Sequence, residues 1–221
     1  MKTRYFSTMA VIMCILLYWP LSVEAEFIPI AINAEVTSVW ENLGALEGRV
    51  NVGDLITGVY VYDSATPDSY PDSSKNLGLY EHYTSPAGIT LTIGGFVFMT
   101  DPANVDFSIY IINDPPVAGG LQEGYDIESR NNLPLPNGVL VGGISLSLRN
   151  YAGDVLSSDT LPTTAPVLDD WDQGGELAVG GIGRSFVIQG RLTSMVLIPE
   201  PATLMFMSLG GLALLRNRRF H

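Results

Sequence analysis

The sequence has very little cysteine and histidine. Cys14 is the single cysteine and lies in an apolar run near the start, and His82 and His221 are the two histidines in 221 residues. Beyond residue 14 the chain therefore has neither a disulfide nor a thiolate nucleophile, and a zinc site needs three or four His, Cys or carboxylate ligands. No G-x-S-x-G sequence supplies a serine nucleophile elbow. We therefore expect that this protein is not an enzyme.

Basic residues are scarce between residues 26 and 198, where 21 acidic side chains stand against 6 basic ones, a net charge of −15. Such an acidic body disfavours nucleic acids and anionic membrane surfaces as partners. Calcium binds clusters of oxygen ligands, and Asp63, Asp68 and Asp72 in one loop region are candidate ligands. Their spacing does not match the D-x-[DN]-x-[DN]-G pattern, so a solvated, turn-forming acidic loop is the favoured interpretation and a calcium site the alternative. No other cofactor is expected.

The N-terminal apolar run is short. Lys2 and Arg4 precede residues 9–19, an apolar run of eleven residues, whereas a membrane span needs about 20. Small residues follow at Val23 and Ala25, the −3 and −1 positions of a cleavage site. This pattern predicts a secretory signal peptide at residues 1–25, cleaved after Ala25 by signal peptidase; an uncleaved anchor is the alternative.

The helical period of 3.6 residues is almost absent between residues 26 and 197. Short runs alternate apolar and polar residues instead, separated by Gly, Pro, Asn and Asp. The runs are residues 34–40, 56–62, 89–93, 96–99, 105–112, 139–148, 176–179 and 184–197. One apolar face per strand indicates half-buried antiparallel sheets, and two such faces bury each other in a sandwich. We expect an all-β, antiparallel β-sandwich at residues 26–197, jelly-roll or Ig-like, with a barrel as the alternative.

Five tyrosines gather between residues 60 and 83. A flat aromatic face can stack on sugar rings, which makes Tyr60, Tyr62 and Tyr80 candidate ligand-binding residues. Cross-strand tyrosine packing on an antiparallel sheet is the competing interpretation. A hydrolase that uses paired carboxylates is a third and less favoured hypothesis, because no pair can be assigned without distances.

The end of the chain has a distinctive three-part order. Pro199-Glu200-Pro201-Ala202-Thr203 is followed by the apolar residues 204–215 and then by Arg216-Asn217-Arg218-Arg219. In this order and position, residues 198–221 resemble the PEP-CTERM sorting signal. The body resembles a β-sandwich module often attached to such tails, through 59–63, 66–68, 85–90, 157–162 and 186–194.

The resemblance implies that exosortase, a membrane enzyme of Gram-negative bacteria that make exopolysaccharide, processes the chain. Pro199, Glu200 and Pro201 are then the recognition motif, and residues 204–215 hold the precursor transiently in the inner membrane as a hydrophobic helix. The basic cluster of Arg216, Arg218 and Arg219 stops transfer on the cytoplasmic side. The implied destination is the cell surface or extracellular matrix, with a structural or adhesive role linked to exopolysaccharide. A carbohydrate-binding module is the alternative.

Overall fold

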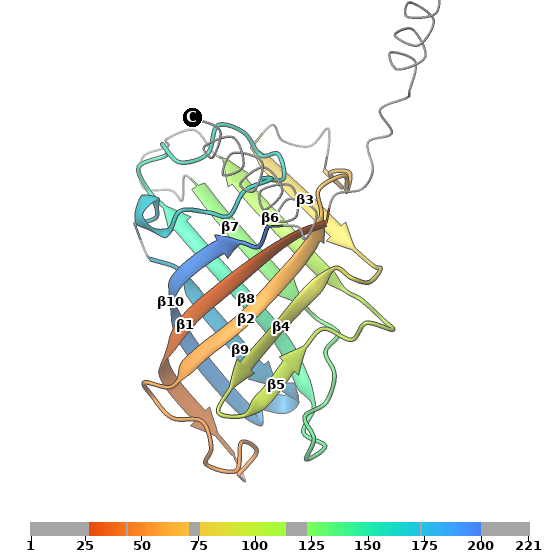
Figure 1. Cartoon of the computed structure of the whole chain (residues 1–221), viewed down its shortest axis with the longest axis vertical. Helices are drawn as coiled ribbons and strands as arrows, with labels where there is room; N and C mark the ends of the chain where they lie inside the picture. The colour runs from red at the N-terminus through yellow and green to blue at the C-terminus, as the bar shows by residue number, and fades with distance from the viewer. Residues whose placement is uncertain (1–26, 43, 71–75, 114–122, 173, 200–221) are drawn as a thin grey trace, which may run out of the picture.

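A computed structural model describes residues 27–42, 44–70, 76–113, 123–172 and 174–199 (Figure 1). In this part the chain is almost entirely β. The strands are β1 (Phe27–Glu41), β2 (Leu55–Asp63), β3 (Leu77–His82), β4 (Gly88–Ile93), β5 (Phe96–Met99), β6 (Phe107–Asn113), β7 (Glu123–Ser129), β8 (Val141–Asn150), β9 (Glu176–Gly181) and β10 (Phe186–Leu197). Two single-turn 3-10 helices, η1 (Leu168–Asp170) and η2 (Ile182–Arg184), lie in the connections on either side of β9.

The ten strands form one antiparallel sheet in the order β3-β6-β7-β8-β9-β10-β1-β2-β4-β5. This sheet curls into a half-barrel whose two halves face each other across a common core (Figure 1). The predicted all-β, antiparallel, sandwich-like fold is confirmed. The layers are the two halves of a single hydrogen-bonded sheet, because the natural twist of a long sheet brings its ends round to face each other.

Strand alternation explains most of these elements. In β6, Phe107, Ile109 and Ile111 are buried on the inner face. The alternating runs in the sequence did not include β3 or β7, and they did not show that β1 starts at Phe27. In β7 only Tyr125 and Ile127 are large apolar residues among acidic and small ones, so its alternation is weak.

Aromatic side chains from distant strands meet in the core. The hydroxyl oxygens of Tyr60 on β2 and Tyr125 on β7 lie 3.1 Å apart. The rings of Phe98 on β5 and Phe186 on β10 have centroids 5.9 Å apart. These strands are not neighbours in the sheet, so the contacts are made across the interior and hold the two halves together.

The two edge strands of the sheet are both covered by backbone contacts. Next to β5, Leu133 donates its N–H to the Met99 carbonyl at 2.9 Å, and Thr100 forms a β-bridge with Asn132. Next to β3, Ser69 donates its N–H to the Leu79 carbonyl at 2.8 Å. These contacts block part of each edge, which reduces its capacity to pair with strands of other chains.

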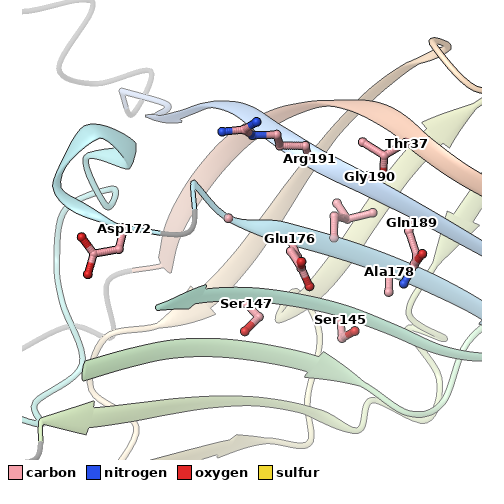
Figure 2. Close-up of a pocket in the computed structure, with 11 residues that line it drawn as sticks. Thr37, Ser145, Ser147, Asp172, Glu176, Ala178, Gln189, Gly190 and Arg191 are labelled. Carbon is pink, nitrogen blue, oxygen red and sulfur yellow. The ribbon is translucent and has the colours of Figure 1, made fainter. Parts of the chain in front are cut away.

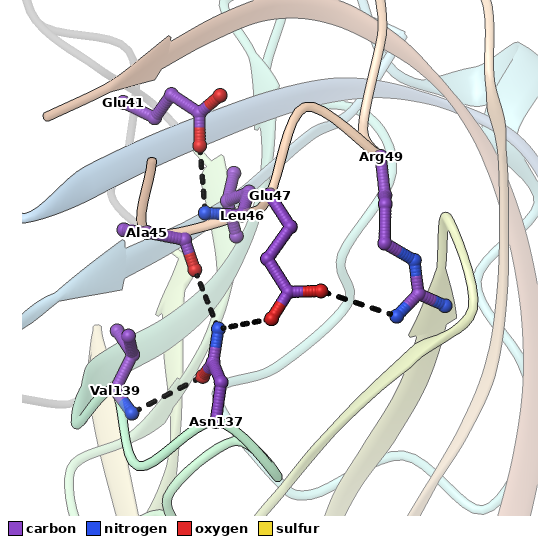
Figure 3. Close-up of polar contacts among 7 residues, drawn as sticks. All are labelled: Glu41, Ala45, Leu46, Glu47, Arg49, Asn137 and Val139. Atoms are coloured by element: carbon purple, nitrogen blue, oxygen red, sulfur yellow. Dashed lines mark hydrogen bonds and ion pairs between the residues drawn. The ribbon is translucent and has the colours of Figure 1, made fainter. Parts of the chain in front are cut away.

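The loop between β1 and β2 closes one end of the half-barrel (Figure 3). Leu46 is fully buried, and its N–H donates to Glu41 Oε2 at 2.6 Å. Asn137 Nδ2 donates to the Ala45 carbonyl at 3.1 Å, tying this loop to the connection before β8. The Arg49 guanidinium lies 4.5 Å from the centre of the Phe96 ring, on the adjacent β4–β5 hairpin.

Among the described residues, no helix has the length and apolar character that a membrane crossing requires. The predicted signal peptide at residues 1–25 and the predicted hydrophobic helix at residues 204–215 lie outside the described residues.

Candidate functional site

The last strand runs directly into the proline-rich motif at the chain's end. β10 pairs with β1 along almost its whole length, and the final pair of the register is Ile30 with Leu197. One residue further on, Ile198 donates its N–H to the Pro29 carbonyl oxygen at 2.9 Å. Pro199 has no N–H to donate, so this ladder of hydrogen bonds stops at Ile198, immediately before the motif.

The start of β1 lies at the same end of the sheet. β1 and β10 are antiparallel neighbours near the middle of the strand order, so the beginning of one lies beside the end of the other (Figure 1). Phe27 is the first residue of β1, two positions after the predicted cleavage at Ala25. The first and last described residues, Phe27 and Pro199, therefore lie at the same end of the sheet, opposite the β1–β2 loop.

The junction is held by backbone hydrogen bonds more than by side-chain burial. Met195 is the last well-buried residue of β10, at 8% exposed. After it, Val196 is 58%, Leu197 36% and Ile198 38% exposed. Strand ends that bury little apolar surface open most easily, so the residues before the motif detach from β1 at lower cost than the rest of β10.

A protein-family model for the PEP-CTERM protein-sorting motif matches residues 197–219. The chain carries a PEP-CTERM sorting motif. This confirms the expectation from the tail and supports a protein that is exported and sorted through exosortase. The match begins at Leu197, so the PEP-CTERM motif starts on the last residue of β10.

No curated protein and no solved structure is similar enough to the chain to give a match. Of the predicted motif residues, Pro199 belongs to the described structure. The predicted residues outside it are Ala25, Glu200, Pro201, Arg216, Arg218 and Arg219. Their roles stay predictions from the sequence.

The predicted surface of tyrosines is wrong. Tyr60 and Tyr62 are fully buried and Tyr80 is 6% exposed, because these large rings fill the inside of the curled sheet. Tyr62 donates its hydroxyl to the Pro162 carbonyl at 2.6 Å, and Tyr80 donates to the Asp159 carbonyl at 2.9 Å. Burial raises the pKa of Tyr60 and of Tyr62 above the ordinary tyrosine value. Tyr62 and Tyr80 therefore hold the connection before η1 against the core, and all three buried rings are unavailable to a ligand.

The candidate calcium ligands serve as local acceptors. Asp63 Oδ1 accepts the Ala65 N–H at 2.8 Å. Asp68 Oδ1 accepts the N–H groups of Tyr70 and Leu79 at 2.8 and 2.9 Å. Asp72 lies outside the described residues. Within the described residues, no group of three or more His, Cys, Asp or Glu is placed to hold a metal ion.

His82, the histidine of the β domain, is buried. It is 5% exposed, and its Nδ1 lies 3.0 Å from the Thr66 hydroxyl. Burial lowers the pKa of His82 to about 4, although the charge on Asp63 opposes the shift. The imidazole is therefore neutral at pH 7 and packs between the Tyr62 and Phe107 rings, with centroids 6.5 and 5.8 Å away.

The sequence missed a polar groove on the outer face of the sheet (Figure 2). It encloses about 440 Å³ over β8, β9, β10 and β1. Polar side chains dominate its lining: Thr37, Ser145, Ser147, Asp172, Glu176, Gln189 and Arg191. A second hollow, lined by Gly143, Gly180 and Val187, continues it and shares Ser145 and Ala178 with it. The signal for this groove in the sequence is the run of Gly, Ser and Ala at outward positions of β8 and β9.

Proposed function

We propose that this chain is a surface or matrix protein of a Gram-negative bacterium, processed by exosortase, with a structural or adhesive and non-catalytic role linked to exopolysaccharide. The observation that carries the proposal is the PEP-CTERM motif, which begins on the last residue of a folded β domain. Signal peptidase removes residues 1–25, and exosortase then acts at Pro199, Glu200 and Pro201.

The tail has the composition of a transient membrane stop. Residues 204–215 form an apolar run of about 12 residues, short of the ~20 needed for a stable span. Arg216, Arg218 and Arg219 follow at once and favour the cytoplasmic side. A short stop before processing suits this tail better than a permanent anchor.

A non-catalytic role agrees with the chemistry of the body. His82, the one histidine between residues 26 and 198, is buried against aromatic rings. The hydroxyls of two buried tyrosines, Tyr60 and Tyr125, contact each other. Among the described residues, Glu123 is the buried carboxylate, and it accepts the backbone N–H groups of Val155 and Leu156.

Mass spectrometry of the C-terminus of the exported protein tests the processing. We expect a mature chain that ends near Pro199-Glu200-Pro201 and lacks residues 204–221. A mature protein that still carries Arg216, Arg218 and Arg219 would overturn the proposal.

The variant Glu200→Ala tests recognition of the motif itself. We expect the uncleaved precursor to accumulate in the inner membrane. Glu176→Ala, which removes a carboxylate from the outer face of the sheet, is the matched control and should be processed normally. Normal release of the Glu200→Ala protein would show that exosortase does not read this residue.

A further inference from the structure

The groove on the outer face owes its shape to a pattern of small and long side chains. Along β8 and β9 the outward positions hold small residues, among them Ser145, Ala178 and Gly180. On β10 the outward positions hold Gln189 and Arg191, which are long and exposed. The register aligns Ser145 with Ala178 and Ala178 with Gln189 across the strands. The small residues therefore form a floor, and the long residues of β10 form a wall beside it.

Two glycines of this floor, Gly143 and Gly180, leave free space above the backbone. A side-chain carbon added at Gly180 would meet no atom within 4 Å, and one at Gly143 would meet only the Ser129 carbonyl, at 3.8 Å. These two residues are paired across β8 and β9. A ligand can therefore lie close to the backbone here, which is the usual use of glycine at binding surfaces.

The polar groups beside this floor are those that bind sugar hydroxyls. Gln189 has an amide that both donates and accepts, Arg191 donates, and Glu176 accepts. Ser145, Ser147 and Thr37 add hydroxyls that do both. Arg191 is aligned with Glu176 on one side and Glu35 on the other, but these three described side chains form no ion pair within 4.0 Å of one another. Their hydrogen-bonding capacity remains available to a ligand.

An exposed aromatic residue, Trp40, lies next to the second hollow. Trp40 on β1 is paired with Val187, which lines that hollow, and Trp40 is 51% exposed. An exposed indole on the same face offers a flat apolar surface against which a sugar ring can stack. Trp40 can therefore stack on a sugar ring, which the buried tyrosines cannot do.

The negative charge of the groove and of the body disfavours an anionic ligand. The lining of the main groove carries two carboxylates, Asp172 and Glu176, and one cation, Arg191. The surrounding body has a net charge of −15, so an anionic polymer would be repelled. An uncharged chain rich in hydroxyls meets no such penalty.

We propose that the outer-face groove over β8, β9 and β10 binds an uncharged oligosaccharide, with Gln189, Arg191 and Glu176 hydrogen-bonded to its hydroxyls and Trp40 stacked on a sugar ring. This proposal deepens the proposed exopolysaccharide-linked role and rests on it. The binding proposal and the sorting proposal can be refuted independently. Binding is measured with purified protein, whereas sorting is measured on the C-terminus of the exported chain.

Titration calorimetry with the exported, processed protein tests the site. The probes are three neutral oligosaccharides, cellotetraose, maltotetraose and chitotetraose, together with the anionic trimer of galacturonic acid. We expect at least one neutral probe to bind and the galacturonate trimer not to bind. The proposal is overturned if no neutral probe binds at millimolar concentration, or if the anionic trimer binds as well as the neutral ones.

Variants locate the site. Gln189→Ala and Arg191→Ala should each weaken binding about tenfold, and Gly180→Val should abolish it by filling the floor. Valine suits a strand and the space above Gly180 is open, so the fold should be retained, as a thermal melt will show. Thr92→Val, on the outward face of β4, is the matched control and should bind normally. Unchanged binding by Gly180→Val and Arg191→Ala would place the sugar elsewhere and overturn the proposal.

Discussion

Ile198 donates its backbone N–H to the carbonyl oxygen of Pro29 at 2.9 Å, one residue beyond the last β1–β10 register pair and immediately before Pro199. Pro199 follows without a spacer. An enzyme that binds Pro199-Glu200-Pro201 must therefore bind directly next to the end of a hydrogen-bonded strand. The exposed side chains of Val196, Leu197 and Ile198 contribute little core burial, which keeps this end easy to open.

Moving the motif away from the sheet should speed its processing. We expect that inserting Gly-Ser-Gly-Ser between Ile198 and Pro199 shortens the half-life of the precursor in a pulse-chase experiment, because exosortase no longer has to detach Ile198 from Pro29. The same insertion after Gly138, in the connection before β8, is the control and should leave the half-life unchanged. A slower conversion with the junction insertion would mean that exosortase needs the folded edge next to its motif.

Removing one hydroxyl of the Tyr60–Tyr125 pair should destabilise the protein more than removing both. Tyr125→Phe leaves the Tyr60 hydroxyl fully buried without its partner, which should lower the free energy of unfolding by about 1–3 kcal/mol. The double variant Tyr60→Phe/Tyr125→Phe removes both hydroxyls and should recover most of that loss. Urea unfolding of the single and double variants measures both values, and additive losses would show that the hydroxyls do not interact.

Acid should destabilise the body through His82. The pKa of His82 is about 4 in the folded protein and near 6.5 in the unfolded chain, so the unfolded chain takes up the proton first as the pH falls. The free energy of unfolding should therefore drop between pH 7 and pH 4, by up to about 3 kcal/mol from this residue.

The variant His82→Gln isolates this effect. It should show a shallower loss of stability between pH 7 and pH 4 than the natural protein, whatever its stability at pH 7. The carboxylates contribute equally to both proteins, so the difference between the two urea-unfolding curves reports His82. Parallel pH profiles would contradict the lowered pKa.

Glu123 should control the order of the long connection between β8 and β9. Its fully buried carboxylate accepts the N–H groups of Val155 and Leu156 at 2.8 and 2.9 Å. Glu123→Ala leaves both donors unpaired, at a cost of about 1–3 kcal/mol each, and we expect fast amide hydrogen exchange at these two residues. Glu123→Gln retains one acceptor oxygen and should protect one of the two amides. Unchanged protection in the Glu123→Ala protein would refute this role.

Several features were readable from the sequence alone because they depend on local order. The PEP-CTERM motif is a linear signal, so its residues are recognisable without a fold. Strands such as β6 and β8 were predicted because one side chain in two is apolar, which is the period of a half-buried strand. The near absence of helical periodicity was sufficient to predict an all-β body.

The tertiary structure decided which face each residue occupies and which strands meet. Tyr60, Tyr62 and Tyr80 were candidates for a sugar-binding face, with packing within the sheet as the competing interpretation. The curl of a single sheet places them inside, where bulky rings fill the space between its halves. The outer groove depends on the register of β8, β9 and β10, which places Ser145, Ala178 and Gln189 side by side although they are far apart in the sequence. Pairing between strands this far apart is a long-range property, so the chain's local pattern did not reveal that the end of β10, where the sorting motif begins, lies beside the start of β1.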